Sequence, residues 1–222
     1  MHTPRLTLPW RFSLLTALAG FASAISLYIW FNAFAVLFGA HLVSSSTIIL
    51  SLLMIMAYGS LLAGRLADRV TGRLLLTAVL SGIAGLFLAF HPLLFRLLAG
   101  LFLKINHAFH LEPFGTEILR LVFVIVFLAI PVASISAIFI FLIRHFIRHT
   151  GQSGRFMGSS LVAGCTGTIA GLLLVLFCTP GFGFRNLQIT ASAVFFLHSA
   201  LNLLLNDLKH TKGHGAPAAI LT

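Results

Sequence analysis

Long apolar runs separated by short polar segments make up most of the chain. A helix needs about 20 apolar residues to cross a bilayer, and six runs are close to that length or longer. No Asp, Glu, Lys or Arg lies near the centre of any of them. The pattern predicts an all-α polytopic membrane protein with six transmembrane helices. The runs cover residues 12–40, 42–63, 74–95, 118–143, 157–178 and 187–205.

The segments outside the runs define the predicted organisation. Residues 1–11 form a basic N-terminus, 12–206 the transmembrane domain and 207–222 a tail. Residues 96–115 mix leucines with lysine, asparagine and histidines, a composition typical of an interfacial amphipathic segment. The first run opens like a signal peptide, but it stays apolar well beyond the small residues 22–24. This favours an uncleaved first helix.

Composition and charge support a membrane location. Only 8% of the residues are charged, against about 25% in soluble domains, and the mean hydropathy is +1.07. These values exclude an ordinary soluble domain.

The net charge of +10 acts as a topology signal, so we do not expect a nucleic-acid partner. With the N-terminus inside, ten of the fourteen Lys and Arg residues fall on the inner side: Arg5, Arg11, Arg65, Arg69, Arg73, Arg144, Arg148, Arg155, Lys209 and Lys212. This asymmetry places both termini in the cytoplasm of a bacterial-type cytoplasmic membrane.

Small residues recur at helical spacing in three of the runs. Because lipid tails are as apolar as leucine, transmembrane helices associate through close packing and interhelical hydrogen bonds. We therefore expect the first, third and fifth helices to pack closely; glycines that line a substrate path are the alternative. The packing residues are Gly20, Ala24, Gly82, Gly85, Gly164, Gly167 and Gly171.

Polar residues share one face of the sixth predicted helix. His198, Asn202 and Asn206 follow one another at a spacing of four, which places them on one side. Polar groups in hydrocarbon need partners, so this face should point inward, as should the isolated Asn32 of the first helix. Structural hydrogen bonding between helices and contact with a substrate are both open interpretations.

The ten histidines raise the question of a metal or haem site. His107 and His110 share a face if their segment is helical, with Glu112 as a third ligand, but zinc sites need three or four ligands. We treat these three residues as weak metal candidates. His91 and His198 lie on different helices, which gives poor support for a haem between them. We predict no cofactor.

We interpret the two cysteines, Cys165 and Cys178, as small buried packing residues.

Two stretches, residues 29–39 and 59–69, resemble the membrane region of spermidine synthase-like proteins fused to a major-facilitator-type helical domain. Residues 154–156 and 180–185 are similar to the later part of that region. The resemblance implies a bundle like half of a major facilitator. It also implies a counterpart of the cytoplasmic signature between the second and third transporter helices, formed here by Gly64, Arg65, Asp68, Arg69 and Arg73. These residues would act as a latch between helices. A static loop anchor is the alternative.

The chain departs from this family in two respects. As aligned, Leu27 and Asn32 replace a usual acidic or amide residue and a usual arginine. We expect this chain to lack the family's aminopropyltransferase domain, and its four acidic residues are scattered. We therefore expect no polyamine synthesis and no other enzymatic activity from this chain.

Three functions fit these observations. The first is a non-catalytic membrane subunit or scaffold that holds other protein subunits, or a second copy of itself, in a larger complex. The second is a dimerising half-transporter for a small organic substrate, with Asn32, His198 and Asn202 as binding groups. The third is an electron-transfer subunit with a histidine-ligated cofactor, in which haem would be visible in an absorption spectrum.

Overall fold

The computed structural model describes residues 10–70, 72–109, 112–146 and 153–214, and these residues contain helices and no strand. The elements are α1 (Trp10–Phe38), α2 (Leu42–Arg69), α3 (Arg73–Phe109), α4 (Pro113–Phe146) and α5 (Ser153–His214). Six spans in them are long and apolar enough to cross a membrane, because α5 contains two. The predicted six-helix, all-α membrane protein is confirmed.

Element α5 is a hairpin of two helices. Its first arm is Met157–Gly181 and its second arm is Gly183–Asp207. The chain reverses between them at Pro180, which has no N–H to donate, and at Gly183, whose φ of 74° and ψ of 162° are not helical. Glycine adopts this positive φ without steric cost, so the turn needs no separate loop.

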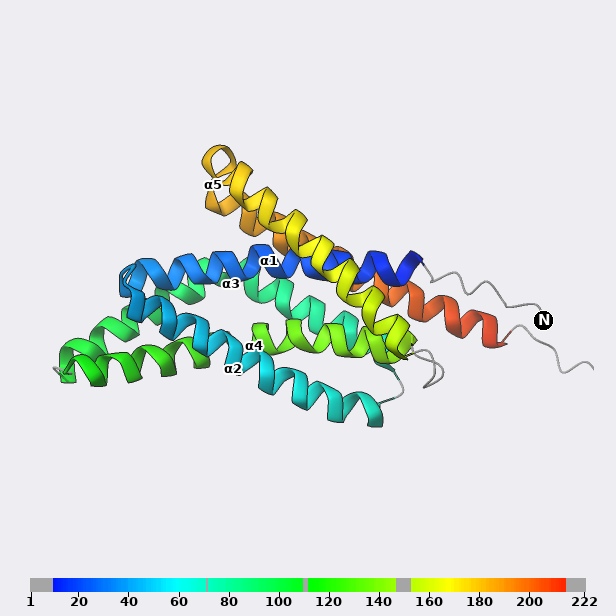
Figure 1. The fold of residues 1–222 in the computed structure, drawn as a ribbon, viewed down its shortest axis with the longest axis horizontal. Coiled ribbons are helices and arrows are strands. Elements are labelled where there is room, and N and C mark those ends of the chain that lie inside the picture. Colours follow the sequence, from blue (N-terminus) through cyan, green and yellow to red (C-terminus); the bar gives the residue numbers. More distant parts are fainter. Residues whose placement is uncertain (1–9, 71, 110–111, 147–152, 215–222) are drawn as a thin grey trace, which may run out of the picture.

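The helices form a bundle in which α1 packs mainly on α5, α2 packs on α4, and α3 contacts both α4 and α5. Figure 1 shows the start of α1 and the end of α5 at the same end of the bundle. The end of α2, the start of α3 and the end of α4 lie there too. We call this the basic end, because it carries Arg65, Arg69, Arg73 and Arg144.

The hairpin of α3 and α4 extends beyond the rest of the bundle at the opposite end (Figure 1). Element α3 has 37 residues, which makes it about 55 Å long, whereas the hydrocarbon core is about 30 Å thick. The amphipathic segment expected at 96–115 is therefore not a separate element. Most of it continues α3, where Phe102 is buried between Phe38 of α1 and Phe123 of α4, while Leu97, Leu101 and Leu103 are exposed.

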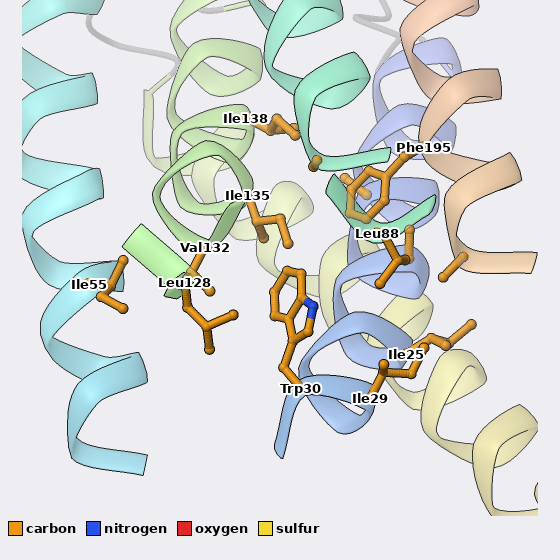
Figure 2. Close-up of a cluster of buried hydrophobic side chains, with 14 of the residues drawn as sticks. Ile25, Ile29, Trp30, Ile55, Leu88, Leu128, Val132, Ile135, Ile138 and Phe195 are labelled. Carbon is orange, nitrogen blue, oxygen red and sulfur yellow. The ribbon is translucent and has the colours of Figure 1, made fainter. Parts of the chain in front are cut away.

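The core is centred on α1, whose Trp30, Phe34 and Ile29 are completely buried. Figure 2 shows the Trp30 ring between the α4 side chains Leu128 and Ile135 and the side chains of α3 and α5. Phe87 of α3 meets the Trp30 ring edge-on, with ring centroids 6.3 Å apart, and Phe127 of α4 packs on Phe87. Such edge-to-face pairs add to the packing energy of the core.

The small residues make two separate contacts with α5. At Gly171, an added Cβ would stand 2.6 Å from the carbonyl oxygen of Phe21, and at Gly20 and Gly167 it would collide with backbone of the facing helix. The first arm of α5 thus touches α1 almost backbone to backbone. At Gly85 the Cβ would stand 3.1 Å from the Cβ of Phe195, so α3 packs on the second arm. Of the three helices expected to pack together, the first and the fifth, which are α1 and the first arm of α5, are in close contact. The third, α3, packs on the second arm of α5 and makes few contacts with α1.

Candidate functional site

The buried polar face of the second arm of α5 meets α3. The Oγ of Ser81 lies 2.7 Å from Nδ1 of His198, and both side chains are completely buried. This contact connects the second arm of α5 with α3.

Three further side chains of this arm donate hydrogen bonds to backbone carbonyls of α3. They are Gln188 Nε2 to Leu88 O at 2.6 Å, Ser192 Oγ to Gly85 O at 2.9 Å and Ser199 Oγ to Ala78 O at 2.7 Å. None of these three side chains was predicted from the sequence. Their spacing of four and seven residues is the signal that could have found them, because it places all three on one helix face.

The structure brings together only two of the four predicted polar residues. Asn202 donates from Nδ2 to the carbonyl oxygen of His198 at 2.7 Å, and its side chain is completely buried. Asn206, one turn further, is only half-buried. Asn32 donates to Tyr28 O in its own helix at 3.0 Å, so it does not join this group. Among the described residues, Asn202 Oδ1 has no hydrogen-bond partner.

The signature residues of the basic end are part of a helix. Gly64, Arg65, Asp68 and Arg69 lie in the last turns of α2, where a loop was expected. The helix continues because Ala63 and Ala67 are buried against Phe141 of α4. The residues that separate α2 from α3 therefore begin at Val70.

Side chains of this region tie α2, α3 and α4 together. Asp68 Oδ1 of α2 and Arg144 of α4 form an ion pair at 2.5 Å. Arg73 of α3 donates from Nε to Ala67 O at 2.9 Å and from its terminal NH1 group to Arg144 O at 3.2 Å. The Arg73 guanidinium thus donates hydrogen bonds to carbonyls at the C-terminal ends of two helices, where the helix dipole favours a cation.

Arg65 and Arg69 take no part in these ties. Both are exposed, and no hydrogen bond or ion pair joins either side chain to the described part of the chain. Gly64 is half-buried, with nothing close enough to exclude a side chain. Of the five predicted signature residues, Asp68 and Arg73 therefore hold helices together and the other three do not.

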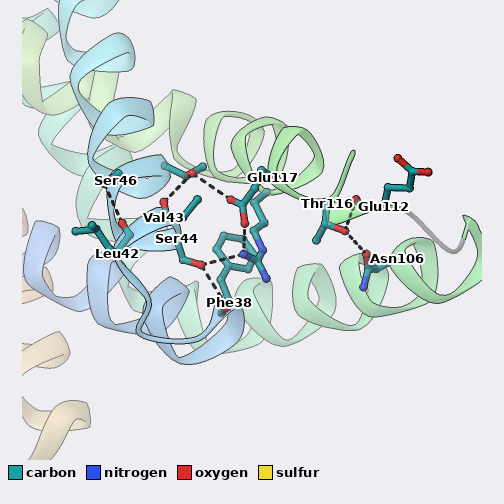
Figure 3. Close-up of polar contacts among 11 residues, drawn as sticks. Phe38, Leu42, Val43, Ser44, Ser46, Asn106, Glu112, Thr116 and Glu117 are labelled. Atoms are coloured by element: carbon teal, nitrogen blue, oxygen red, sulfur yellow. Dashed lines mark hydrogen bonds and ion pairs between the residues drawn. The ribbon is translucent and has the colours of Figure 1, made fainter. Parts of the chain in front are cut away.

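A second charged cluster lies at the opposite end and was not predicted (Figure 3). Glu117 and Arg120 of α4 form an ion pair, and Thr47 of α2 donates to Glu117 Oε2 at 3.2 Å. Arg120 donates to Ser44 Oγ at 2.9 Å, and its guanidinium lies over the ring of Phe38. Both charges fall at the edge of an apolar run, where they look like flanking residues, so hydropathy alone does not reveal the cluster.

The predicted metal ligands are not assembled into a site. His107 and Glu112 are exposed, at the end of α3 and before α4, and His110 lies outside the described residues. Within the described ranges, no group of three or more His, Cys, Asp or Glu residues could hold a metal ion.

His91 and His198 do not face each other. His91 is stacked on Phe95, with ring centroids 5.4 Å apart, whereas His198 lies at the level of Ser81. Ten residues separate Ser81 from His91 on α3, which is about 15 Å along the helix. This is too far for both imidazoles to ligate one iron.

The two cysteines differ from expectation. Cys165 is exposed on the first arm of α5 and Cys178 is partly exposed, so neither is a buried packing residue. The packing positions of this arm are taken by its glycines, and Cys165 therefore lies on the side that faces away from α1.

The chain matches no family model, and no curated protein and no solved structure is significantly similar to it. Membership of the spermidine synthase-like membrane family therefore stays a prediction, which rests on the motifs of residues 29–39 and 59–69.

Proposed function

We propose that this chain is a non-catalytic integral membrane subunit or scaffold of a larger complex. The observation that carries the proposal is the use of its polar side chains. His198, Ser192 and Ser199 join helices to each other, as do Asp68 and Arg73 at the basic end. Because these polar groups form hydrogen bonds and ion pairs between helices, they stabilise a bundle on which other protein subunits can assemble.

The first arm of α5 is the surface that we assign to a partner. Only 22% of its apolar span is buried, against 61% for α1. Thr166, Leu173 and Phe177 are exposed on the face opposite the glycines that contact α1. The small side chains Cys165 and Thr166 would let another helix approach closely. The partner would be another membrane subunit or a second copy of this chain.

The setting that we propose is the cytoplasmic membrane of a bacterium, with both termini and the basic end in the cytoplasm. The excess of Lys and Arg at that end supports this orientation. The resemblance to the spermidine synthase-like membrane region adds one candidate partner, a separate soluble aminopropyltransferase-like protein at the cytoplasmic face.

The experiment is a measurement of the mass of the complex extracted from its membrane in polymer-bounded discs, without detergent. A stoichiometric second polypeptide or a second copy is the expected result. Thr166→Trp should shift the population to the single chain, because the large side chain blocks the assigned face. Ala57→Trp, at an exposed position of α2, is the matched control. A single chain for the unaltered protein would overturn the proposal.

A half-transporter that dimerises around a small organic substrate is the second candidate. It is favoured by three of the four buried side-chain atoms that have no hydrogen-bond partner among the described residues, namely Trp30 Nε1, His91 Nε2 and Asn202 Oδ1. Uptake into proteoliposomes that is abolished by Asn202→Ala would support this function.

The histidine-ligated electron-transfer subunit is the least supported candidate, because His91 and His198 are far apart. A visible absorption spectrum without haem bands would exclude haem.

A further inference from the structure

A groove lies between α2 and α4, on the membrane-facing side. It has a volume of about 490 Å³, which is in the range of small-molecule sites. Its lining contains no charged residue: Met54, Ile55, Tyr58, Gly59, Leu62, Ile125, Ala129, Ile130 and Ala133.

Small residues create the groove. The backbone of α4 comes so close to Gly59 that an added Cβ would stand 2.8 Å from the Cα of Ala133. The helices are therefore in contact at this point, while larger side chains on either side form walls. Tyr58 is 66% exposed on the α2 wall and Ile130 is 62% exposed on the α4 wall. The space between them is open to the surrounding lipid and shaped for a flexible apolar chain.

Arg65 and Arg69, which are unpaired within the described part of the chain, continue the α2 wall. Tyr58, Leu62, Arg65 and Arg69 are spaced four, three and four residues apart, so they form one stripe on the helix. Met54 to Leu62 span about 12 Å along the axis, close to the about 15 Å depth of one bilayer leaflet. Arg65 follows one turn beyond Leu62, at the level where a phospholipid carries its phosphate.

The charges around this position favour an anion. At the neighbouring ends of α2, α3 and α4, Arg65, Arg69, Arg73 and Arg144 are accompanied by Asp68. Asp68 is already paired with Arg144, and Arg73 is bound to carbonyls of α2 and α4. Arg65 and Arg69 remain available to a ligand. An anionic headgroup near the membrane surface attracts each such cation.

From this arrangement we infer that the α2–α4 groove binds one anionic phospholipid. An acyl chain occupies the groove between Tyr58 and Ile130, and Arg65 and Arg69 hold the headgroup phosphate. The inference does not depend on the proposed scaffold function, because the groove lies between α2 and α4 and the assigned partner face lies on α5.

Retention of lipid by the purified full chain tests the inference. The chain is reconstituted with an equimolar mixture of phosphatidylglycerol and phosphatidylcholine, released into detergent and weighed by native mass spectrometry. One retained phosphatidylglycerol is expected. Arg65→Gln and Arg69→Gln should each weaken its retention about fivefold. Both side chains are exposed, and neither has a partner among the residues that the structure describes, so we expect these variants to keep the fold.

Two controls separate the groove from general attraction of a basic protein to anionic lipid. Arg11→Gln removes one charge from α1, at the same end of the bundle, and should leave retention unchanged. Ala129→Phe fills the groove and should reduce retention, whereas Ala200→Phe, at an exposed position of α5, should not. Equal retention of both lipids, equal losses for Arg11→Gln and Arg65→Gln, or equal effects of the two phenylalanines would overturn the inference.

A photocrosslinking amino acid in place of Tyr58 distinguishes a lipid from a protein occupant. In the native membrane, the expected adduct has the mass of a phospholipid. An adduct of protein size would show that a partner helix fills the groove, and it would overturn the inference.

Discussion

Ser81 and His198 are 117 residues apart in the chain, yet Ser81 Oγ lies 2.7 Å from His198 Nδ1 in the centre of the bundle. Ser81 also donates to Thr77 O in its own helix at 2.7 Å. The Ser81–His198 pair thus joins α3 and α5 at one point. This contact ties the second arm of α5 into the bundle.

Replacing Ser81 with alanine should lower the free energy of unfolding by about 0.6–2 kcal/mol, because a His198 ring nitrogen loses its partner in an apolar environment. Thermal unfolding in detergent micelles measures the change. Ser46→Ala is the matched control, since Ser46 bonds to Leu42 O in the same way but is exposed. Equal losses for the two variants would contradict a role for the Ser81–His198 contact.

The contact of Gly167 with α1 should make that position intolerant of any side chain. We expect Gly167→Ala to destabilise the protein by about 1–3 kcal/mol, because the added carbon collides with the backbone of Ala17 and the helices must separate. Gly100→Ala should instead stabilise α3 by up to about 1 kcal/mol, because nothing lies near that glycine and alanine is the better helix former. The same unfolding assay compares them, and a neutral Gly167→Ala would refute the packing argument.

At the basic end, Arg73 should matter more than Asp68. Arg73→Gln removes two hydrogen bonds from a cation to helix carbonyls, which we expect to cost about 1–3 kcal/mol. Asp68→Asn breaks an ion pair whose side chains are 49% and 59% exposed, so its effect should stay below about 1 kcal/mol and disappear at high salt. Unfolding of both variants at low and high ionic strength is the measurement. A larger effect of Asp68→Asn would reverse this ranking.

A double-mutant cycle should reveal coupling between Glu117 and Arg120. Their side chains are 29% and 19% exposed, so Arg120→Met leaves a poorly solvated carboxylate and should cost about 1–3 kcal/mol. Glu117→Gln in the same chain should restore part of that loss, because no unpaired charge then remains. Strictly additive effects would show that the two side chains act independently.

The six membrane spans are readable in the sequence because hydropathy is a local property that each segment carries independently of its neighbours. The small-residue spacing likewise identified Gly20, Gly167 and Gly171 as packing positions, since close approach of backbones requires glycine wherever the facing helix lies. The inward position of His198 and Asn202 follows from the same local argument about polar groups in hydrocarbon.

The helix partners depend on the tertiary structure. Hydropathy does not show that Ser81 faces His198 or that Thr47 faces Glu117, because many helix arrangements bury the same apolar area. The ends of helices are also decided by packing: residues 64–69 stay helical because Ala63 and Ala67 are buried against α4. Residues 96–109 extend α3 because Phe102 is covered by α1 and α4. The groove between α2 and α4 exists only where two helices meet at Gly59, so no single segment of the chain could have indicated it.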